Sequence, residues 1–420
     1  MNHTASPPRH SLGPNNIDDD ELRMLIAEGI GPVFHARLLS AFGCARAVTR
    51  ASERELAEVD GIGEVRAAKL RRALDACDPA AERSAMARWG ATLLRRDDAG
   101  YPALLATIPD PPPALWVRGA FDAADGCCVA IVGSRRCTSY GREQASKISF
   151  ALGASGFTIV SGGARGIDAA AHRAALRASA RTIAVLGCGL AHCYPPEHDE
   201  LYQAIAAHGA VISESPMTTL PRPEMFPRRN RIISGLALGV IVVEAALRSG
   251  ALITAREAAE SHHREVMALP GPVDSPVSAG CHRAIREGWA GLVTDVEDVL
   301  AQLETTTLLV EAVRAIGDRG APDRAPSALG APCGVIEAGA TAAPRAPPAD
   351  LREVILEVLR RHGPSSGPAI AARLASSPGP VMAALTMLQL ARAVVHRRGA
   401  FSLSTHSEAA HAGTAKRGDR

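Results

Sequence analysis

The chain has 420 residues, 47% hydrophobic and 21% charged, which is enough to bury a sizeable core and to form two to four domains. Its 46 basic and 44 acidic residues leave a formal net charge of only +2. This near-balance excludes a protein that attracts anions through a strong overall field, so any anion site must be built locally. The cysteines lack paired C-x-x-C spacing, and no apolar run reaches the length of a membrane span. We therefore expect a cytoplasmic protein with no membrane contact.

Residues 1–17 form a polar stretch that we expect to be a disordered lead-in, and residues 18–83 have the pattern of a helical domain. Two similar stretches lie inside it, "EGIGPVFHARLLSAFG" and "VDGIGEVRAAKLRRAL". Each places a Gly-Ile-Gly turn before an amphipathic helix, and such a turn can expose backbone N–H groups at the start of that helix. This pattern is typical of a helix-hairpin-helix or SAM-like module that holds a nucleic-acid phosphate. A plain helical bundle with glycine caps explains it equally well.

Residues 84–303 begin with a proline-rich connector, "YPALLATIPDPPPALWVRG", and then change pattern at Cys127. Short apolar runs alternate with helical stretches, the runs being "CCVAIVG", "FTIVSG", "TIAVLG", "AVISES", "GVIVVEA" and "EVMALP". Strands that are apolar throughout belong to a parallel sheet covered on both faces. The sequence therefore predicts an α/β fold here, a Rossmann-like core with a doubly wound and mostly parallel sheet.

Residues 304–349 are rich in Ala, Pro and Gly and are predicted to be a flexible linker. Residues 350–403 contain three helical stretches and the hairpin-like "VVHRRGAFSL", which together predict a winged helix. Its middle segment has few basic residues, so contact with protein is at least as plausible as contact with DNA. Residues 404–420 are expected to be a disordered tail.

Glycine-rich turns follow the predicted strands at the edge where open parallel sheets bind their ligands. Gly133-Ser134-Arg135 follows the first run, and Ser161-Gly162-Gly163 follows the second. Such turns can present backbone N–H groups to a phosphate at a helix N-terminus. Several of them on one edge favour a phosphate-bearing ligand. Neither G-x-G-x-x-G after the first strand nor G-x-x-x-x-G-K-[ST] is present, which disfavours a dinucleotide and a P-loop nucleotide.

The stretch "FPRRNRIISGL" is predicted to be a helix that starts at Pro227, with Phe226 just outside it. At 100° per residue, Arg228 and Arg231 share a flank that can reach a phosphate, while Asn230 points away from the core. Arg229 lies closer to the core, where it can hold Glu244 or a loop carbonyl instead. The ring of Phe226 fits a stacking platform for a base and a core anchor equally well. Three other positions are expected to face the core: Ile232, Ile233 and Leu236.

The cysteines and histidines near residues 188–198 and 262–282 match no zinc spacing, so we predict no metal. No Ser-His-Asp or Cys-His arrangement is evident, so we predict no catalytic residue, and we expect no cofactor. Several phosphate sites in a row beside an aromatic ring favour a single nucleic-acid strand over a mononucleotide. The predicted DNA-binding residues share the carboxyl edge of the sheet and the arginine-rich helix. They are Gly133, Ser134, Arg135, Ser161, Gly162, Gly163, Phe226, Arg228, Arg229, Asn230 and Arg231.

The motifs "VAIVGSRRCTSYG", "TIVSGGARGIDAAAH", "LGCGLAHCYPPEH", "FPRRNRIISGL", "VVEAALRSGALITA" and "EVMALPGPVDSP" occur in this order. The sequence resembles the DNA-processing protein A (DprA, or Smf) family over about residues 18–403. The resemblance implies a single-stranded DNA-binding recombination mediator that forms a homodimer through its core. It also implies that the protein helps to load a RecA-type recombinase onto strands covered by single-strand-binding protein, in DNA uptake, natural transformation and homologous recombination.

Two other functions compete with this interpretation. One is a nucleotide-processing enzyme of the same Rossmann-like superfamily, such as a phosphoribohydrolase, which carries P-G-G-x-G-T-x-x-E. Here the corresponding loop is "SGGARGID", and Glu244 ends a different strand. The other is an adaptor whose DNA binding is vestigial, which the intact arginine cluster disfavours.

Overall fold

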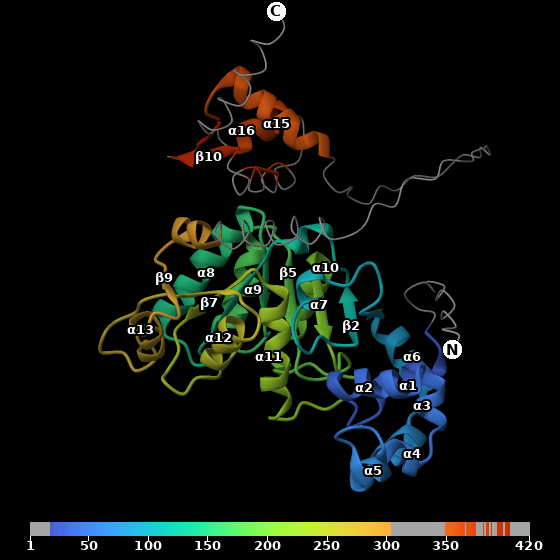
Figure 1. The fold of residues 1–420 in the computed structure, drawn as a ribbon. Helices are drawn as coiled ribbons and strands as arrows, with labels where there is room; N and C mark the ends of the chain where they lie inside the picture. Colours follow the sequence, from blue (N-terminus) through green and yellow to red (C-terminus); the bar gives the residue numbers. More distant parts are fainter. Residues whose placement is uncertain are drawn as a thin grey trace, which may run out of the picture. The chain divides into compact units, whose positions relative to one another are not determined.

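A computed structural model describes residues 17–303 and, with gaps, residues 349–403 (Figure 1). The chain divides into two compact units, Met1–Val299 and Leu300–Arg420, and each is treated by itself. The expected lead-in, nearly all of the expected linker and the expected tail lie outside the described residues. Within the described part, no helix has the length and hydropathy needed to cross a bilayer.

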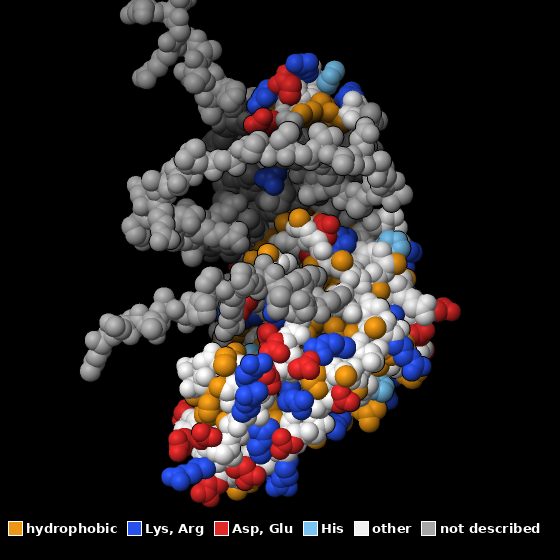
Figure 2. Space-filling model, turned by 90° about the vertical axis from the view of Figure 1, so that its right-hand side faces the viewer, with side chains coloured by type: hydrophobic (Ala, Val, Ile, Leu, Met, Phe, Trp, Pro, Cys, Tyr) orange, Lys and Arg blue, Asp and Glu red, His pale blue; other side chains and the backbone are white. Residues whose placement is uncertain are grey.

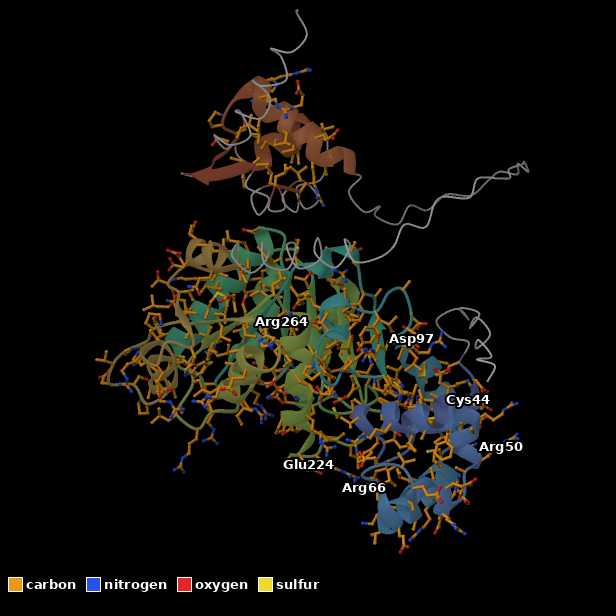
Figure 3. The ribbon with its side chains drawn as sticks, in the orientation of Figure 1. Cys44, Arg50, Arg66, Asp97, Glu224 and Arg264 are labelled. Atoms are coloured by element: carbon orange, nitrogen blue, oxygen red, sulfur yellow. The ribbon has the colours of Figure 1, made fainter. Side chains whose placement is uncertain are left out.

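Residues 19–89 form short helices with a core of their own, which includes Leu38, Leu56 and Leu70. The guanidinium carbon of Arg66, which is labelled in Figure 3, lies 4.6 Å from the centre of the Phe34 ring, so the helix of the second stretch contacts the helix of the first. Whether these helices form a helix-hairpin-helix or SAM-like module stays a prediction. The helices are α1 (Asp19–Ile26), α2 (Pro32–Phe42), α3 (Ala45–Arg50), α4 (Glu53–Ala57), α5 (Gly63–Ala76) and α6 (Pro79–Trp89).

Within residues 91–292, nine strands form one sheet in the order β1-β2-β6-β5-β4-β3-β7-β8-β9. Pairing is parallel from β6 to β9, as the sequence predicts, while β2 is antiparallel to both of its neighbours. The strands are β1 (Ala91–Arg95), β2 (Ala114–Gly119), β3 (Cys128–Gly133), β4 (Thr158–Ser161), β5 (Thr182–Val185), β6 (Ala210–Ser213), β7 (Gly239–Val243), β8 (Glu265–Ala268) and β9 (Gly291–Leu292).

Strands β1 and β2 are absent from the sequence-based prediction, which assigned no element to residues 91–95 and treated residues 101–119 as a connector. Trp116 lies in β2 opposite Ser213 of β6, and its side chain is fully buried. The prolines that precede β2 disguise it, because proline is normally excluded from strands except at their ends or at sheet edges.

Helices cover both faces of the sheet (Figure 1). Helix α11 packs on one face, where the predicted core residues Ile232, Ile233 and Leu236 are all buried. Helices α8, α9 and α10 lie on the opposite face, and α8 runs against α9. The helices of this part are α7 (Ala103–Ala106), α8 (Ser139–Ala154), α9 (Ile167–Arg177), α10 (Asp199–His208), α11 (Met225–Leu236), α12 (Gly250–Glu260) and α13 (Ala279–Arg286).

The chain reverses direction across the sheet at β3. It steps outward from β3 through β4 and β5 to β6, and then returns to place β7, β8 and β9 on the other side of β3. The connections that leave β3 and β7 therefore diverge. A crevice at such a switch point, beyond the carboxyl ends of the strands, is where open α/β sheets bind ligands.

The second unit contains α15 (Ala349–His362), α16 (Gly367–Arg373) and an antiparallel pair, β10 (Val394–Arg397) with β11 (Ala400–Leu403). Ile355, Ile370 and Phe401 are buried in its core. The pair falls in the segment "VVHRRGAFSL", as predicted, while assignment to the winged-helix class stays a prediction.

Buried histidine makes the stability of the sheet-containing unit depend on pH. His172 of α9 is fully buried, its Nδ1 lies 2.7 Å from the hydroxyl of Thr182, and burial lowers its pKa to about 3. The unfolded chain therefore binds more protons below about pH 6.5, so that stability falls as the pH falls. Acidification from pH ~6.5 to pH ~5 should cost about 1.5–2 kcal/mol through this residue.

We expect His172→Gln to remove that part of the pH dependence, as measured by denaturant unfolding at the two pH values. His208→Gln, which changes an exposed histidine of α10, is the matched control and should keep the wild-type dependence. An unchanged pH dependence in His172→Gln would show that the histidine is not buried as a neutral group.

Candidate nucleic-acid interface

The ends of β3 and β7 lie too close together for a side chain at Gly133. A Cβ there would stand 2.0 Å from the carbonyl oxygen of Val243, so only glycine fits. The next residue, Ser134, donates its N–H to the carbonyl of Glu244 at 2.8 Å and accepts from the N–H of Ile167 at 3.2 Å. The loop after β3 is thus tied to β7 on one side and to the start of α9 on the other.

Glu244 is a structural group at the switch point. Its buried carboxylate accepts hydrogen bonds from the backbone N–H of Thr138, at 2.8 Å, and from the hydroxyl of the same residue. Thr138 is the N-cap of α8 and also accepts from the N–H of Gly141 at 3.1 Å. Glu244 has φ +55°, an uncommon conformation for a residue other than glycine. Its carboxylate fixes the start of α8 rather than facing open solvent.

Arg229 is buried and contacts the Ser161-Gly162-Gly163 loop on the side that faces the protein interior. Its Nη1 donates to the carbonyl oxygens of Gly162 and Val185, which confirms the expected loop-carbonyl contact. A Cβ on Gly162 would stand 2.7 Å from both Arg229 Nη2 and Asp168 Oδ2. Burial raises the pKa of Asp168, and the Arg229 guanidinium opposes that rise. The glycine therefore lets a buried cation and a buried carboxyl group approach from its two sides.

The other members of this loop are also held in place. The hydroxyl of Ser161 donates to the carbonyl of Ile131 at 2.6 Å, which links β4 to β3. The carbonyl of Gly163 accepts from the hydroxyl of Tyr202 at 2.9 Å and lies 3.0 Å from Nδ1 of His198. The loop is thus fixed by polar contacts on its buried side.

Arg231 differs from the expectation that it shares an exposed flank with Arg228. Its side chain is only 7% exposed, and its Nε pairs with Asp110 at 2.9 Å. Its Nη2 pairs with Glu214, which follows β6. Arg228 is exposed and Asn230 is half-buried. Helix phase alone misses this arrangement, because both carboxylates come from segments distant in the sequence.

The helix itself begins earlier than predicted. Helix α11 starts at Met225, so Phe226 and Pro227 both lie in its first turn. The half-buried ring of Phe226 lies 5.4 Å from the Tyr194 ring, and the guanidinium carbon of Arg135 stands 5.3 Å from its centre. The structure thus joins Arg135 and Phe226, which the sequence separates by about ninety positions. Half-burial is compatible with both the anchoring and the stacking role.

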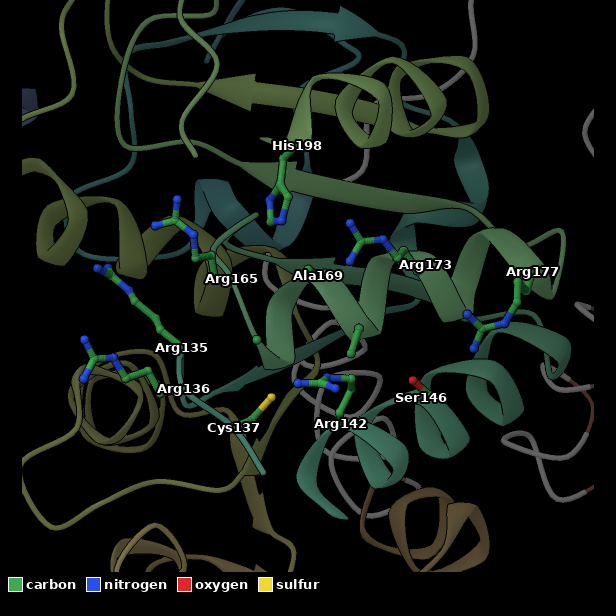
Figure 4. Close-up of a pocket in the computed structure, with 12 residues that line it drawn as sticks. Arg135, Arg136, Cys137, Arg142, Ser146, Arg165, Ala169, Arg173, Arg177 and His198 are labelled. Atoms are coloured by element: carbon green, nitrogen blue, oxygen red, sulfur yellow. The ribbon is translucent and has the colours of Figure 1, made fainter. Parts of the chain in front are cut away.

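A cleft of about 470 Å³ opens beside Arg135, between α8, α9 and the loops that precede them (Figure 4). We name it the arginine cleft, because its lining includes six arginines and no acidic residue. Arg165 pairs with Glu197 of a neighbouring turn at 2.9 Å, a contact that lowers the pKa of Glu197 to about 2. The six arginines that line the cleft are Arg135, Arg136, Arg142, Arg165, Arg173 and Arg177.

Sequence reasoning found only Arg135 of this set. Arg173 and Arg177 are four residues apart in a predicted helix, which places them on one side of it. That spacing was the available signal, but the cleft joins three separate segments of the chain, which are residues 135–146, residues 165–177 and His198.

The cysteines and histidines near residues 188–198 make contacts with backbone carbonyls. The thiol of Cys193 donates to the carbonyl of Pro195 at 3.2 Å, and Nε2 of His192 lies 3.0 Å from the carbonyl of Thr218. Among the described residues, no three His, Cys, Asp or Glu side chains gather in a way that could hold a metal ion.

Comparisons with known proteins agree on one family. Residues 92–304 match the DNA recombination-mediator protein A family. Protein Smf of Synechocystis is 41% identical over 286 residues, covering 67% of this chain and 71% of that protein. DNA processing protein DprA of Streptococcus pneumoniae is 45% identical over 204 residues, covering 49% of this chain and 71% of that protein. The X-ray structure of the S. pneumoniae DNA processing protein A superposes with a TM-score of 0.60 and 36% identity, covering 68% of this chain and 98% of that one.

The close approach around Gly162 gives a direct test of the buried support. In Gly162→Ala, the new methyl group would force the guanidinium of Arg229 and the carboxyl group of Asp168 apart. We expect a loss of about 1–3 kcal/mol in the free energy of unfolding, measured with urea.

The matched control is Gly250→Ala in α12, whose added Cβ would meet nothing within 4 Å. It should be neutral or slightly stabilising, since alanine restricts the unfolded chain more than glycine does. Equal unfolding midpoints for the two variants would contradict the described packing around Gly162.

Proposed function

The chain belongs to the DNA recombination-mediator protein A family, and from this premise we propose that it is a single-stranded DNA-binding recombination mediator rather than an enzyme. In this role it forms a homodimer through its Rossmann-like core. It helps to load a RecA-type recombinase onto strands covered by single-strand-binding protein, in the cytoplasm, during DNA uptake and homologous recombination. The observation that carries the proposal is the meeting of Arg135 and Phe226 at the carboxyl edge of the sheet.

Two exposed arginines supply the phosphate contacts in this proposal. Arg135 follows β3 and Arg228 lies in the first turns of α11, and both are exposed. Neither has a carboxylate within ion-pair distance among the described residues, whereas Arg231 has two. Guanidinium groups suit phosphate because their planar N–H donors match its oxygens.

The remaining predicted site residues have a supporting role in this proposal. Arg229, Arg231 and Ser161 are buried and bonded to neighbouring elements. Gly133 and Gly162 leave room that a side chain would close. Ser134, Gly163 and Asn230 lie beside them and complete the site.

The ring of Phe226 favours a single strand over a duplex. A base of a single strand exposes its face and can stack on an aromatic ring, which a base inside a duplex cannot do. Arg135 beside the ring can hold the phosphate that adjoins the stacked base. This pairing of ring and cation does not select among bases, because every base has such a face.

The rival enzyme requires a carboxyl group that faces a substrate. Glu244, the acidic residue at the switch point, is buried and bonded to both the N–H and the hydroxyl of Thr138. Asp168 is likewise buried and accepts from the N–H of Ala164 at 3.2 Å. Both groups are engaged in holding loops, which favours the binding role over the nucleotide-processing one.

The flanking parts complete the proposed organisation. We assign residues 18–83 to a helix-hairpin-helix or SAM-like domain, residues 84–303 to the DNA-binding core and residues 350–403 to a winged helix. We assign residues 304–349 to the linker that joins these last two domains.

Substitutions at the exposed site should separate charge from stacking. Arg135→Ala or Arg228→Ala should weaken binding to all single strands alike and flatten the slope of log affinity against log salt by about 0.7. Phe226→Ala should cost about 1–3 kcal/mol of binding free energy with the slope nearly unchanged. The measurement is a fluorescence anisotropy titration with single-stranded oligonucleotides over a range of salt concentrations.

Arg286→Ala, which removes an exposed arginine of α13, is the matched control and should bind as the wild type does. Thermal melts establish that each variant is folded. The proposal fails if Arg135→Ala and Arg228→Ala melt normally and keep the wild-type affinity and slope.

A further inference from the structure

We propose that the arginine cleft is a second binding track, which holds the sugar–phosphate backbone of the strand as it leaves the sheet edge. This inference rests on the proposed function and extends it. The sheet edge would take a base and its phosphate, while the cleft would take the phosphates that follow, without reading sequence.

The charge of the cleft differs from that of the surface elsewhere. The chain carries nearly equal numbers of basic and acidic residues, so a general excess of arginine does not explain six arginines without an acidic residue in one lining. Figure 2 shows basic and acidic side chains intermingled over the described surface that faces the viewer. Arginines outside the cleft commonly pair with carboxylates, as Arg71 does with Asp75 at 2.7 Å and Arg95 with Asp98 at 2.8 Å.

Within the part of the chain that the structure describes, no ion pair offsets the repulsion between three of the arginines in the cleft. Arg173 and Arg177 are exposed and four residues apart on α9, a spacing at which like charges destabilise a helix. Arg142 of α8 lines the same cleft from the other side. Among the described residues, no carboxylate lies within ion-pair distance of these three. A bound polyanion would relieve the repulsion between them.

The shape of the cleft suits a backbone better than a base. Its lining includes Gly166, Ala169 and Ala170, small residues that leave room between the arginines. No aromatic side chain other than His198 lines it, so it has no large stacking face. Helix α9 runs about 15 Å from its first residue to Arg177, at 1.5 Å per residue. That length covers several phosphates of a stacked strand, which are about 3.4 Å apart.

The cleft is continuous with the sheet-edge site. Arg135 lines the cleft and also lies over the ring of Phe226. Gly166, with φ +78°, lies against the same loop, since a Cβ there would stand 2.3 Å from the carbonyl oxygen of Ser134. Figure 4 shows the arginines ranged from Arg135 and Arg136 at one side to Arg177 at the other. One strand can therefore pass from the ring of Phe226 into the cleft and remain beside arginine side chains along the whole path.

The test uses the full chain with all three helix arginines changed, Arg142→Gln, Arg173→Gln and Arg177→Gln. Anisotropy titrations compare a short single strand of about 4 nucleotides with a long one of about 15 nucleotides, within the range of known single-strand site sizes. The salt slope for the long strand should fall by about two units, from three lost contacts at about 0.7 each. A fourfold reduction in salt should then widen the affinity gap to the wild type about 15- to 20-fold.

Binding of the short strand should be unchanged in the triple variant and should fall in Phe226→Ala. This pair of results would show that the short strand binds at the sheet edge and not in the cleft. The matched control is a second triple variant with the same loss of charge away from the cleft: Arg96→Gln, Arg256→Gln and Arg286→Gln. It should bind both strands with nearly the wild-type slope. Thermal melts check that each variant is folded. Arg177→Gln alone, at the far end of the cleft, should lower the slope of log affinity against log salt for the long strand by about 0.7.

Several results would overturn the proposal while leaving the proposed function intact. One is a triple variant that keeps the wild-type affinity and slope for the long strand. Another is an equal loss for the short and long strands, which would make the cleft part of a single site. A third comes from titration of the same triple variant with polyglutamate: loss of polyglutamate binding with strand binding retained would make the cleft a surface for acidic protein segments. Failure of the wild type to bind either strand would instead overturn the proposed function itself.

Discussion

The buried guanidinium of Arg229 is the constraint on which the candidate site depends. A charge taken out of water is costly unless hydrogen-bond partners and an opposite charge replace its hydration. Here the carbonyls of Gly162 and Val185 and the nearby carboxyl group of Asp168 take that role. Meeting this requirement fixes the position of α11 relative to β5 and to the loop after β4. The same contacts set where the exposed residues of α11 stand.

The arginines of the site therefore fall into two groups, buried ones that contact protein groups and exposed ones that can contact a ligand. Arg229 donates to carbonyl oxygens and Arg231 pairs with carboxylates inside the protein. Arg135 and Arg228 remain exposed on the elements that those contacts hold in place. A binding site held by such a bonded support loses less conformational entropy when a ligand arrives. The glycine turns serve the same end, because the backbone segments approach too closely for side chains at Gly133 and Gly162.

Much of this arrangement could be predicted from the sequence, and the exceptions share a physical cause. Period and composition predicted the parallel strands, the burial of Ile232 and Ile233, and the inward direction of Arg229, because these follow from local pattern. The ion pairs of Arg231 were missed, since their carboxylates lie far away in the chain. Strands β1 and β2 were missed, β2 because prolines directly precede it, and most of the arginine cleft was missed because segments distant in the sequence build it.

Backbone hydrogen exchange of the full chain, measured with and without a saturating single-stranded oligonucleotide, tests the central claim most directly. If the carboxyl edge binds the strand, amides of the loops that follow β3 and β4 and of the first turns of α8, α9 and α11 should gain protection. Amides at the opposite edge of the sheet should exchange as before. Protection confined to the N-terminal helices or to the second unit, with these loops unchanged, would contradict the account.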